Sequence, residues 1–181
     1  MTSIVDKILA ISAALDDRRL PHAFGGALAL AFCTERARGT IDIDVNVFVG
    51  QGEARRVVDA LPGQIGHTDA DLLALERDGQ TRLRWEQTPV DLFLDTTEFH
   101  VEAAPRRRRH EFGGRQIPFL GCSDLAVFKA FFNRTKDWAD LEEMVAIRAL
   151  NIDQTIGVLV RYLGEDDDRV DRLRRLSPPG G

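Results

Sequence analysis

The sequence contains few cysteines and no long apolar run. Its two cysteines, Cys33 and Cys122, lie in apolar surroundings, which fits two reduced core thiols better than a disulfide framework or a zinc site. No apolar stretch is long enough to span a bilayer. Because Asp6 and Lys7 interrupt the N-terminal segment, it does not resemble a signal peptide. We therefore expect a cytoplasmic protein with no membrane partner.

The chain has fewer positive than negative side chains: 24 Lys and Arg against 29 Asp and Glu give a formal net charge of −5. This balance argues against nucleic-acid binding by the whole surface, but it allows a local basic patch. The strongest basic cluster is Arg106, Arg107, Arg108 and Arg109. Such a run is either a solvated surface or a contact site for RNA phosphates, and the sequence leaves both open.

The residue patterns predict a mixed α/β (α+β) chain. Ile4, Ile8, Ile11 and Leu15 recur at helical spacing. Strands and helices alternate up to residue 121, which predicts a core over 1–121 with a small mixed sheet flanked by helices. Only helices follow over 122–176, as a bundle packed on the core, and the tail 177–181 is expected to be disordered. Further helices are expected over 27–32, 53–61, 124–133 with Ser123 as N-cap, 137 to about 150, 153–163 and 166–176. Strands are expected over 41–49, 81–86, 90–94 and 116–120. The segment 99–109 is ambiguous.

A glycine turn and two carboxylates form the most informative motif. Gly25-Gly26 precedes a helical segment, whose free N–H groups would suit a phosphate. Asp42 and Asp44 follow on an expected strand, where side chains alternate, so both carboxylates share one face while Ile41, Ile43 and Val45 share the other. Two crowded carboxylates disfavour each other's ionisation unless a cation is present, and Mg²⁺ prefers such oxygen ligands.

A third carboxylate, Asp91, stands within the apolar run Val90–Leu94. An uncompensated charge there would be costly, so we expect Asp91 to join Asp42 and Asp44 as a metal ligand. The set of three would bind one or two Mg²⁺ ions, with Mn²⁺ able to substitute, and would support in-line phosphoryl transfer. The alternative is that each Asp only faces solvent.

The few lysines add a second candidate group. They are Lys7, Lys129 and Lys136, and Lys129 lies on an otherwise apolar helix, where it either binds a triphosphate or reaches the surface along its stem. Asp137 is well placed to cap the next helix, and Asp140 shares a face with Lys136.

The Gly-Gly turn, helix and Asp-x-Asp order resembles the nucleotidyltransferase superfamily of the DNA polymerase beta type. The glycine segment with Arg38, Thr40, Asp42 and Asp44 looks like the AbiEii-type branch, bacterial toxins that include the MenT-like toxins. The likeness continues over 125–130 and 134–141, which resemble the downstream Lys and Lys-Asp-x-x-Asp-Leu motifs of that branch.

The resemblance implies the nucleotidyltransferase fold and an enzyme that transfers a nucleoside monophosphate from an NTP to RNA. The favoured acceptor is the 3′ end of tRNA, translation would be blocked, and a cognate antitoxin would restrain the enzyme. The implied catalytic residues are Asp42, Asp44, Asp91, Lys129 and Asp140, and the implied nucleotide-binding residues are Gly25, Gly26, Arg38, Thr40 and Lys136.

One departure and three alternatives accompany this interpretation. The superfamily often has Ser where this chain has Gly26, so backbone N–H groups and Thr40 would replace that hydroxyl, and Gly26→Ser is expected to be tolerated. The alternatives are transfer to a small molecule, AMPylation of a partner protein by an antitoxin, and a non-catalytic nucleotide-binding module.

Overall fold

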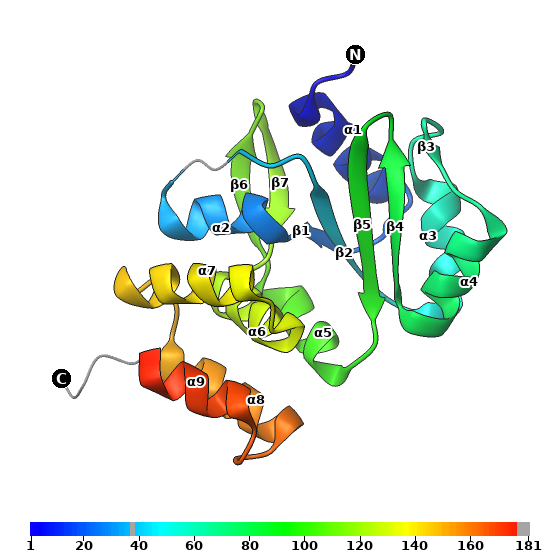
Figure 1. Ribbon diagram of the computed structural model, residues 1–181. Coiled ribbons are helices and arrows are strands. Elements are labelled where there is room, and N and C mark those ends of the chain that lie inside the picture. The colour runs from blue at the N-terminus through cyan, green and yellow to red at the C-terminus, as the bar shows by residue number, and fades with distance from the viewer. Residues whose placement is uncertain (37–38, 177–181) are drawn as a thin grey trace. The chain divides into compact units, whose positions relative to one another are not determined.

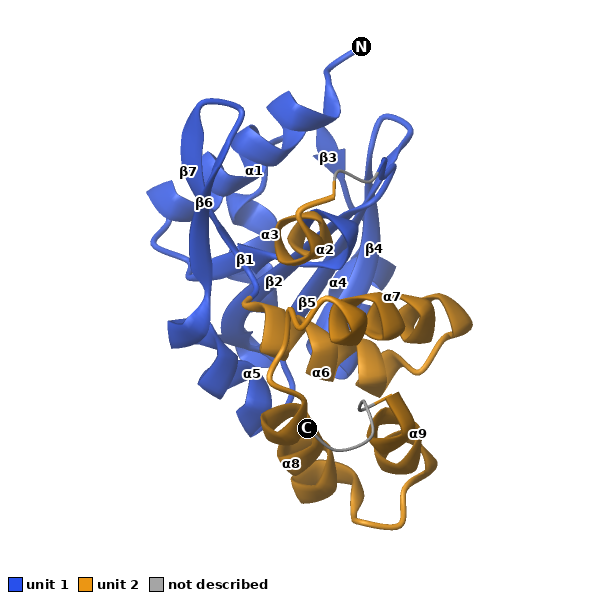
Figure 2. Cartoon of the chain, turned by 90° about the vertical axis from the view of Figure 1, so that its left-hand side faces the viewer, with its two compact units in different colours: residues 1–28, 38–120 blue, residues 29–37, 121–181 orange. Residues whose placement is uncertain are grey.

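The computed structural model describes residues 1–36 and 39–176. The chain forms two compact units (Figure 2): unit 1 comprises residues 1–28 and 38–120, and unit 2 comprises residues 29–37 and 121–181. The division passes through α2 (Gly26–Thr34) and falls again after Leu120. Arg38 and the tail 177–181, for which sequence predictions were made, lie outside the described residues.

Unit 1 is built on a mixed sheet. Within the described residues the sheet has seven strands in the order β3-β4-β5-β2-β1-β7-β6 (Figure 1). β2 is parallel to β5 and β1 is parallel to β7, whereas the other neighbours are antiparallel. The strands are β1 (His22–Phe24), β2 (Ile43–Gly50), β3 (Ile65–Gly66), β4 (Gln80–Trp85), β5 (Thr88–Asp95), β6 (Arg108–Phe112) and β7 (Arg115–Phe119).

The helices of unit 1 follow ordinary capping and patterning. The predicted N-terminal helix is confirmed as α1, whose Ser3 side chain accepts a hydrogen bond from the backbone N–H of Asp6. Ile8, Ile11 and Leu15 of this helix are fully buried. The helical segments are α1 (Ile4–Asp17), α3 (Ala54–Ala60), α4 (Asp69–Asp78) and α5 (Glu98–Ala103), with 3₁₀ turns η1 (Gln51–Glu53) and η2 (Ala104–Arg106).

A buried lysine ties α1 to the turn between β4 and β5. The Lys7 ammonium, 2% exposed, donates to the Trp85 carbonyl at 3.1 Å, to Glu86 Oε2 at 2.9 Å and to Thr88 Oγ1 at 3.0 Å. Three acceptors satisfy its three donors, so this cation is compensated within the fold.

Unit 2 is helical in its described residues. α6 contacts both α7 and α8, and α8 contacts α9. α6 begins at Cys122 and not at Ser123: Gly121 is the N-cap, and the Ser123 hydroxyl accepts from the Asn151 N–H at 3.2 Å, so the predicted Ser123 cap is wrong. Besides the C-terminal part of α2, the unit contains α6 (Cys122–Phe132), α7 (Thr135–Ala146), α8 (Ile152–Leu163) and α9 (Asp168–Leu176).

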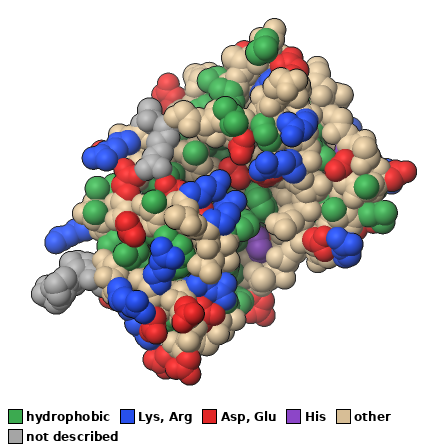
Figure 3. Space-filling model, viewed as in Figure 1, with side chains coloured by type: hydrophobic (Ala, Val, Ile, Leu, Met, Phe, Trp, Pro, Cys, Tyr) green, Lys and Arg blue, Asp and Glu red, His purple; other side chains and the backbone are tan. Residues whose placement is uncertain are grey.

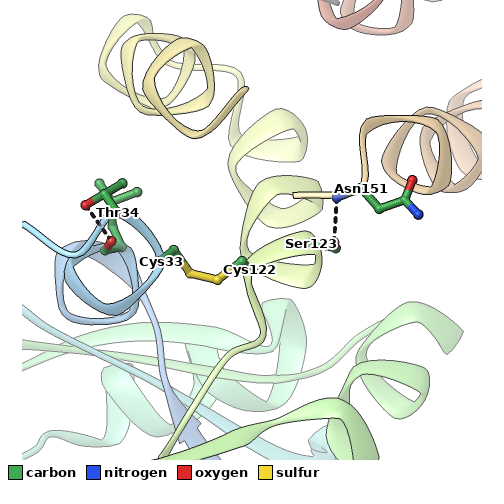
Figure 4. The surroundings of a disulfide bond; sticks show 6 residues. Cys33, Thr34, Cys122, Ser123 and Asn151 are labelled. Atoms are coloured by element: carbon green, nitrogen blue, oxygen red, sulfur yellow. Dashed lines mark hydrogen bonds between the residues drawn. A yellow bond between two sulfur atoms is a disulfide. The ribbon is translucent and has the colours of Figure 1, made fainter. Parts of the chain in front are cut away.

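The two cysteines form a disulfide, which corrects the expectation of two reduced thiols (Figure 4). Cys33 lies near the end of α2 and Cys122 opens α6, with their Cα atoms 5.6 Å apart. The residues are 89 positions apart, so their pairing depends on the fold and could not be read from local spacing. The cysteines therefore give no argument for a reducing compartment.

The mixed α/β class is confirmed, but several elements were not predicted. The sequence did not predict β1, β3, α4 and β6. The ambiguous segment 99–109 contains α5, η2 and the start of β6. No helix in the described part of the chain meets the length and hydropathy needed to cross a membrane.

Candidate active site

The first aspartate of the pair precedes its strand. β2 begins at Ile43, and Ile41, which was expected to share a face with Ile43, is 77% exposed whereas Ile43 is fully buried. Asp42 is held in a local turn, because the Thr40 hydroxyl accepts from the Asp42 N–H at 3.2 Å and donates to the Asp42 carbonyl at 2.9 Å. Thr40 thus positions Asp42, whereas its predicted contact with nucleotide stays a prediction.

Gly26 and Asp44 are in close contact. β1 and β2 are antiparallel, and the Gly25 N–H donates to the Asp44 carbonyl at 2.9 Å. A Cβ at Gly26 would lie 1.9 Å from Asp44 Oδ2, and Gly26 has a φ of +53°, which disfavours other residues. The expectation that Gly26→Ser is tolerated is therefore wrong. The Asp44 carboxylate lies directly against the residue that starts α2.

The second and third aspartates are neighbours on parallel strands. The register pairs Asp44 of β2 with Asp91 of β5, flanked by Ile43 with Val90 and Val45 with Leu92. These four apolar flanking residues are all fully buried. The pleat therefore directs Asp44 and Asp91 to the opposite face from this core.

Arg82 of β4 joins two of these carboxylates. It is the direct cross-strand partner of Asp91. Its Nε donates to Asp91 Oδ1 and its Nη2 to Asp91 Oδ2, each at 2.7 Å, and the same Nη2 lies 3.6 Å from Asp42 Oδ2. The hydrogen bonds that Arg82 donates to Asp91, the charge of Asp91 and then the charges of Asp42 and Asp44 raise the pKa of Arg82 above its usual range.

Arg82 changes the basis on which Asp91 was selected. In the sequence Asp91 is an acidic residue among apolar neighbours, but in the fold Arg82 compensates its charge. The missed signal is Thr81-Arg82-Leu83-Arg84, where arginines alternate with partly or fully buried residues on the neighbouring strand. A cross-strand pair of opposite charges is a common stabilising arrangement.

The carboxylate oxygens of Asp42 and Asp91 are suitable ligands for a hard cation. Asp42 Oδ2 and Asp91 Oδ2 both approach one guanidinium nitrogen, so they converge on a position that already accepts positive charge. The described residues contain no group of three or more His, Cys, Asp or Glu arranged to hold a metal. Two carboxylates are still sufficient for Mg²⁺, which usually completes its shell with water and substrate phosphate oxygens.

The predicted lysine and acids of the downstream motif lie together in unit 2. Lys129 is 6% exposed, and its Nζ lies 2.6 Å from Asp140 Oδ2 and 3.7 Å from Asp137 Oδ1. Asp137 caps α7, because its carboxylate accepts from the Arg134 backbone N–H at 3.2 Å. Asp140 is thus the direct partner of Lys129, and Lys136 is exposed on the first turn of α7.

The basic run is divided among several local contacts. Arg106 stacks over the Phe99 ring at 5.8 Å, Arg107 donates to the Ala104 carbonyl, and Arg109 donates to the Gln116 carbonyl at 2.6 Å. Arg108 and Arg109 are exposed on β6, an edge strand. On the face shown in Figure 3, basic and acidic side chains are interspersed. Charged residues on an edge strand also discourage pairing with other chains.

This topology, with a glycine turn before α2 and aspartates on adjacent parallel strands, is the nucleotidyltransferase fold. The crystal structure of ANT(2″)-Ia in complex with adenylyl-2″-tobramycin matches with a TM-score of 0.61 and 19% identity, over 97% of this chain and 100% of that one. The solution structure of the antibiotic-resistance factor ANT(2″)-Ia matches with a TM-score of 0.54 and 18% identity, over 94% of this chain and 89% of that one. No model of a known protein family and no curated protein matches the sequence.

Proposed function

We propose that this chain is a divalent-metal-dependent nucleotidyltransferase that transfers a nucleoside monophosphate from an NTP to an acceptor hydroxyl. The observation that carries the proposal is the convergence of Asp42 and Asp91 on one cationic nitrogen, beside Asp44 of β2, which packs against Gly26 at the start of α2. The shared fold of ANT(2″)-Ia supports the same class of reaction.

In this reaction the acceptor oxygen attacks the α-phosphorus, the bond to the bridging oxygen breaks, and pyrophosphate leaves. The acceptor proton passes to a carboxylate or to solvent. Asp42 and Asp91, with Asp44 beside them, would hold a Mg²⁺ ion, which would neutralise charge on the triphosphate and activate the acceptor hydroxyl. Gly26, the first residue of α2, packs against Asp44, so a phosphate bound at the N-terminus of this helix would lie near the Asp44 carboxylate.

We further propose RNA as the acceptor, with the 3′ end of tRNA as the specific target and a cognate antitoxin as the regulating partner. The sequence resemblance to AbiEii-type and MenT-like toxins supports the target and the antitoxin. Exposed Arg108 and Arg109 on the edge of the sheet support contact with RNA phosphates.

A second candidate acceptor is a small hydroxylated molecule. It is favoured by the solved structure of ANT(2″)-Ia, which contains adenylyl-2″-tobramycin and shares its fold with nearly the whole of this chain. In that case the basic edge strand has no role in substrate binding.

The test is transfer of label from each α-labelled NTP, with Mg²⁺, to total bacterial RNA or to an aminoglycoside. We expect labelled RNA of tRNA size with the native chain and none with Asp42→Asn. An Arg108→Ala/Arg109→Ala variant should lose RNA labelling, whereas an Arg18→Ala/Arg55→Ala control on the exposed surface should retain it. Labelled aminoglycoside and unlabelled RNA would favour the second candidate, and no labelled product in any arm would contradict the enzyme assignment.

A further inference from the structure

Arg82 occupies the position that a metal ion between Asp42 and Asp91 would need. Its Nη2 lies 2.7 Å from Asp91 Oδ2 and 3.6 Å from Asp42 Oδ2. A Mg²⁺ ion binds carboxylate oxygens at about 2.0–2.1 Å, so an ion that bridges Asp42 Oδ2 and Asp91 Oδ2 would overlap the Nη2 group that contacts the same two oxygens. Metal and Arg82 are therefore alternative partners of the same two side chains.

The contact of Arg82 with Asp91 and Asp42 has more interactions than an ordinary surface ion pair. Arg82 makes a bidentate contact with Asp91, whose side chain is 15% exposed, and it also faces a second carboxylate from another segment. Bidentate contacts between Arg and carboxylate groups fix geometry as well as charge. Arg82 itself is 54% exposed, so it has free space into which it can move when a competing cation arrives.

We propose that Arg82 is a built-in counter-ion of the carboxylate cluster that a divalent metal must displace. Arg82 then stabilises the cluster without metal and weakens metal binding. This inference rests on the proposed function, because it requires that Asp42 and Asp91 bind a metal.

The experiment is a titration of metal-free protein with Mn²⁺, following free Mn²⁺ by electron paramagnetic resonance. The variants are Arg82→Gln, Arg82→Lys and the control Arg84→Gln, which removes an exposed arginine two residues along the same strand. Arg82→Gln should lower the Kd for Mn²⁺ by about fivefold, which corresponds to about 1 kcal/mol, the upper end for a partly exposed ion pair. Arg82→Lys should give a smaller change, because one ammonium cannot make the bidentate contact, and Arg84→Gln should leave the Kd unchanged.

The outcomes separate this inference from the proposed function. Equal or weaker Mn²⁺ binding by Arg82→Gln, with the native chain binding through Asp91, would overturn only the counter-ion role. Loss of Mn²⁺ binding in Asp91→Asn identifies the site. Absence of Mn²⁺ binding in all these proteins would overturn both the metal site and the counter-ion role. Arg82→Lys keeps the test decisive if Arg82→Gln does not fold.

Discussion

Single residues decide whether the carboxylate cluster can form. The sequence predicted Asp42, Asp44 and Asp91 as one cluster; the structure pairs Asp44 with Asp91 on adjacent strands and brings Asp42 and Asp91 to Arg82, and their role stays a prediction. The sequence could not identify Arg82, because the pairing of Arg82 with Asp91 depends on the register between β4 and β5. The tolerance of Gly26 to substitution was also predicted wrongly, because the contact between Gly26 and Asp44 depends on the pairing of β1 with β2.

Replacing Gly26 by alanine should damage both stability and activity. The new Cβ would lie 1.9 Å from Asp44 Oδ2, and the φ of +53° disfavours alanine. We expect the free energy of unfolding to fall by about 2 kcal/mol, and transfer activity to be lost because Asp44 moves. Thermal unfolding and the labelling assay measure these effects. Gly63→Ala is the control, because a Cβ there meets open space; equal effects of both variants would contradict the prediction.

Asp95, at the end of β5, should make stability depend on pH. Burial raises its pKa to about 6, and its Oδ1 is buried without a hydrogen-bond partner in the described structure. The folded state therefore binds the proton more tightly than the unfolded state, so stability present below pH 4 is lost as pH rises through about 6.

Asp95→Asn should remove this loss. We expect the variant to exceed the native chain by about 1 kcal/mol at pH 7.5, after allowing for solvent screening, and to match it near pH 4. Urea unfolding at several pH values is the measurement, with exposed Asp59→Asn as the control. A difference that does not change with pH would show that burial of the Asp95 charge is not its cause.

Among the secondary-structure elements, those with regular apolar spacing were mostly predicted, whereas α4 and the polar strand β6 were not. α1 was identified from its apolar spacing, and α4 was missed although Thr68 and Asp71 form a capping box at its start. β6 was missed because its sequence Arg-Arg-His-Glu-Phe is polar, and it is a strand because it pairs with β7 after the Gly113-Gly114 turn.

Lys7 should be essential for the attachment of α1 to the β4–β5 turn. Lys7→Ala would leave the Trp85 carbonyl and the Thr88 hydroxyl without their buried donor. We expect a loss of about 3 kcal/mol in the free energy of unfolding. Differential scanning calorimetry measures it, with Lys136→Ala as the control because Lys136 is exposed. Similar melting temperatures for Lys7→Ala and the native chain would mean that the three contacts add little.

At the scale of the whole molecule, the fold class followed from the alternation of strands and helices. The two-unit division and the disulfide did not, because they join segments far apart in the sequence. Residues 29–37 belong to the same unit as residues 121–181, an arrangement that no local pattern indicates.

The disulfide should contribute strongly to stability. Cys33 and Cys122 are separated by 89 positions, so their bond restricts a large part of the unfolded chain. Loss of the bond should cost about 4–5 kcal/mol in the loop-entropy description. The measurement is guanidinium unfolding with and without reductant. A Cys33→Ser/Cys122→Ser variant should be insensitive to reductant, and a native chain that is equally insensitive would show that the bond is not formed.

The same bond makes the backbone from Cys33 to Cys122 a closed covalent ring. The ring contains every strand of the sheet except β1, because β2 to β7 all lie between the two cysteines. A protease that cuts one peptide bond in this segment opens the ring but does not divide the molecule. Without reductant, the nicked chain therefore keeps its full mass, and the Gly-Gly turn stays covalently linked to all three aspartates of the cluster.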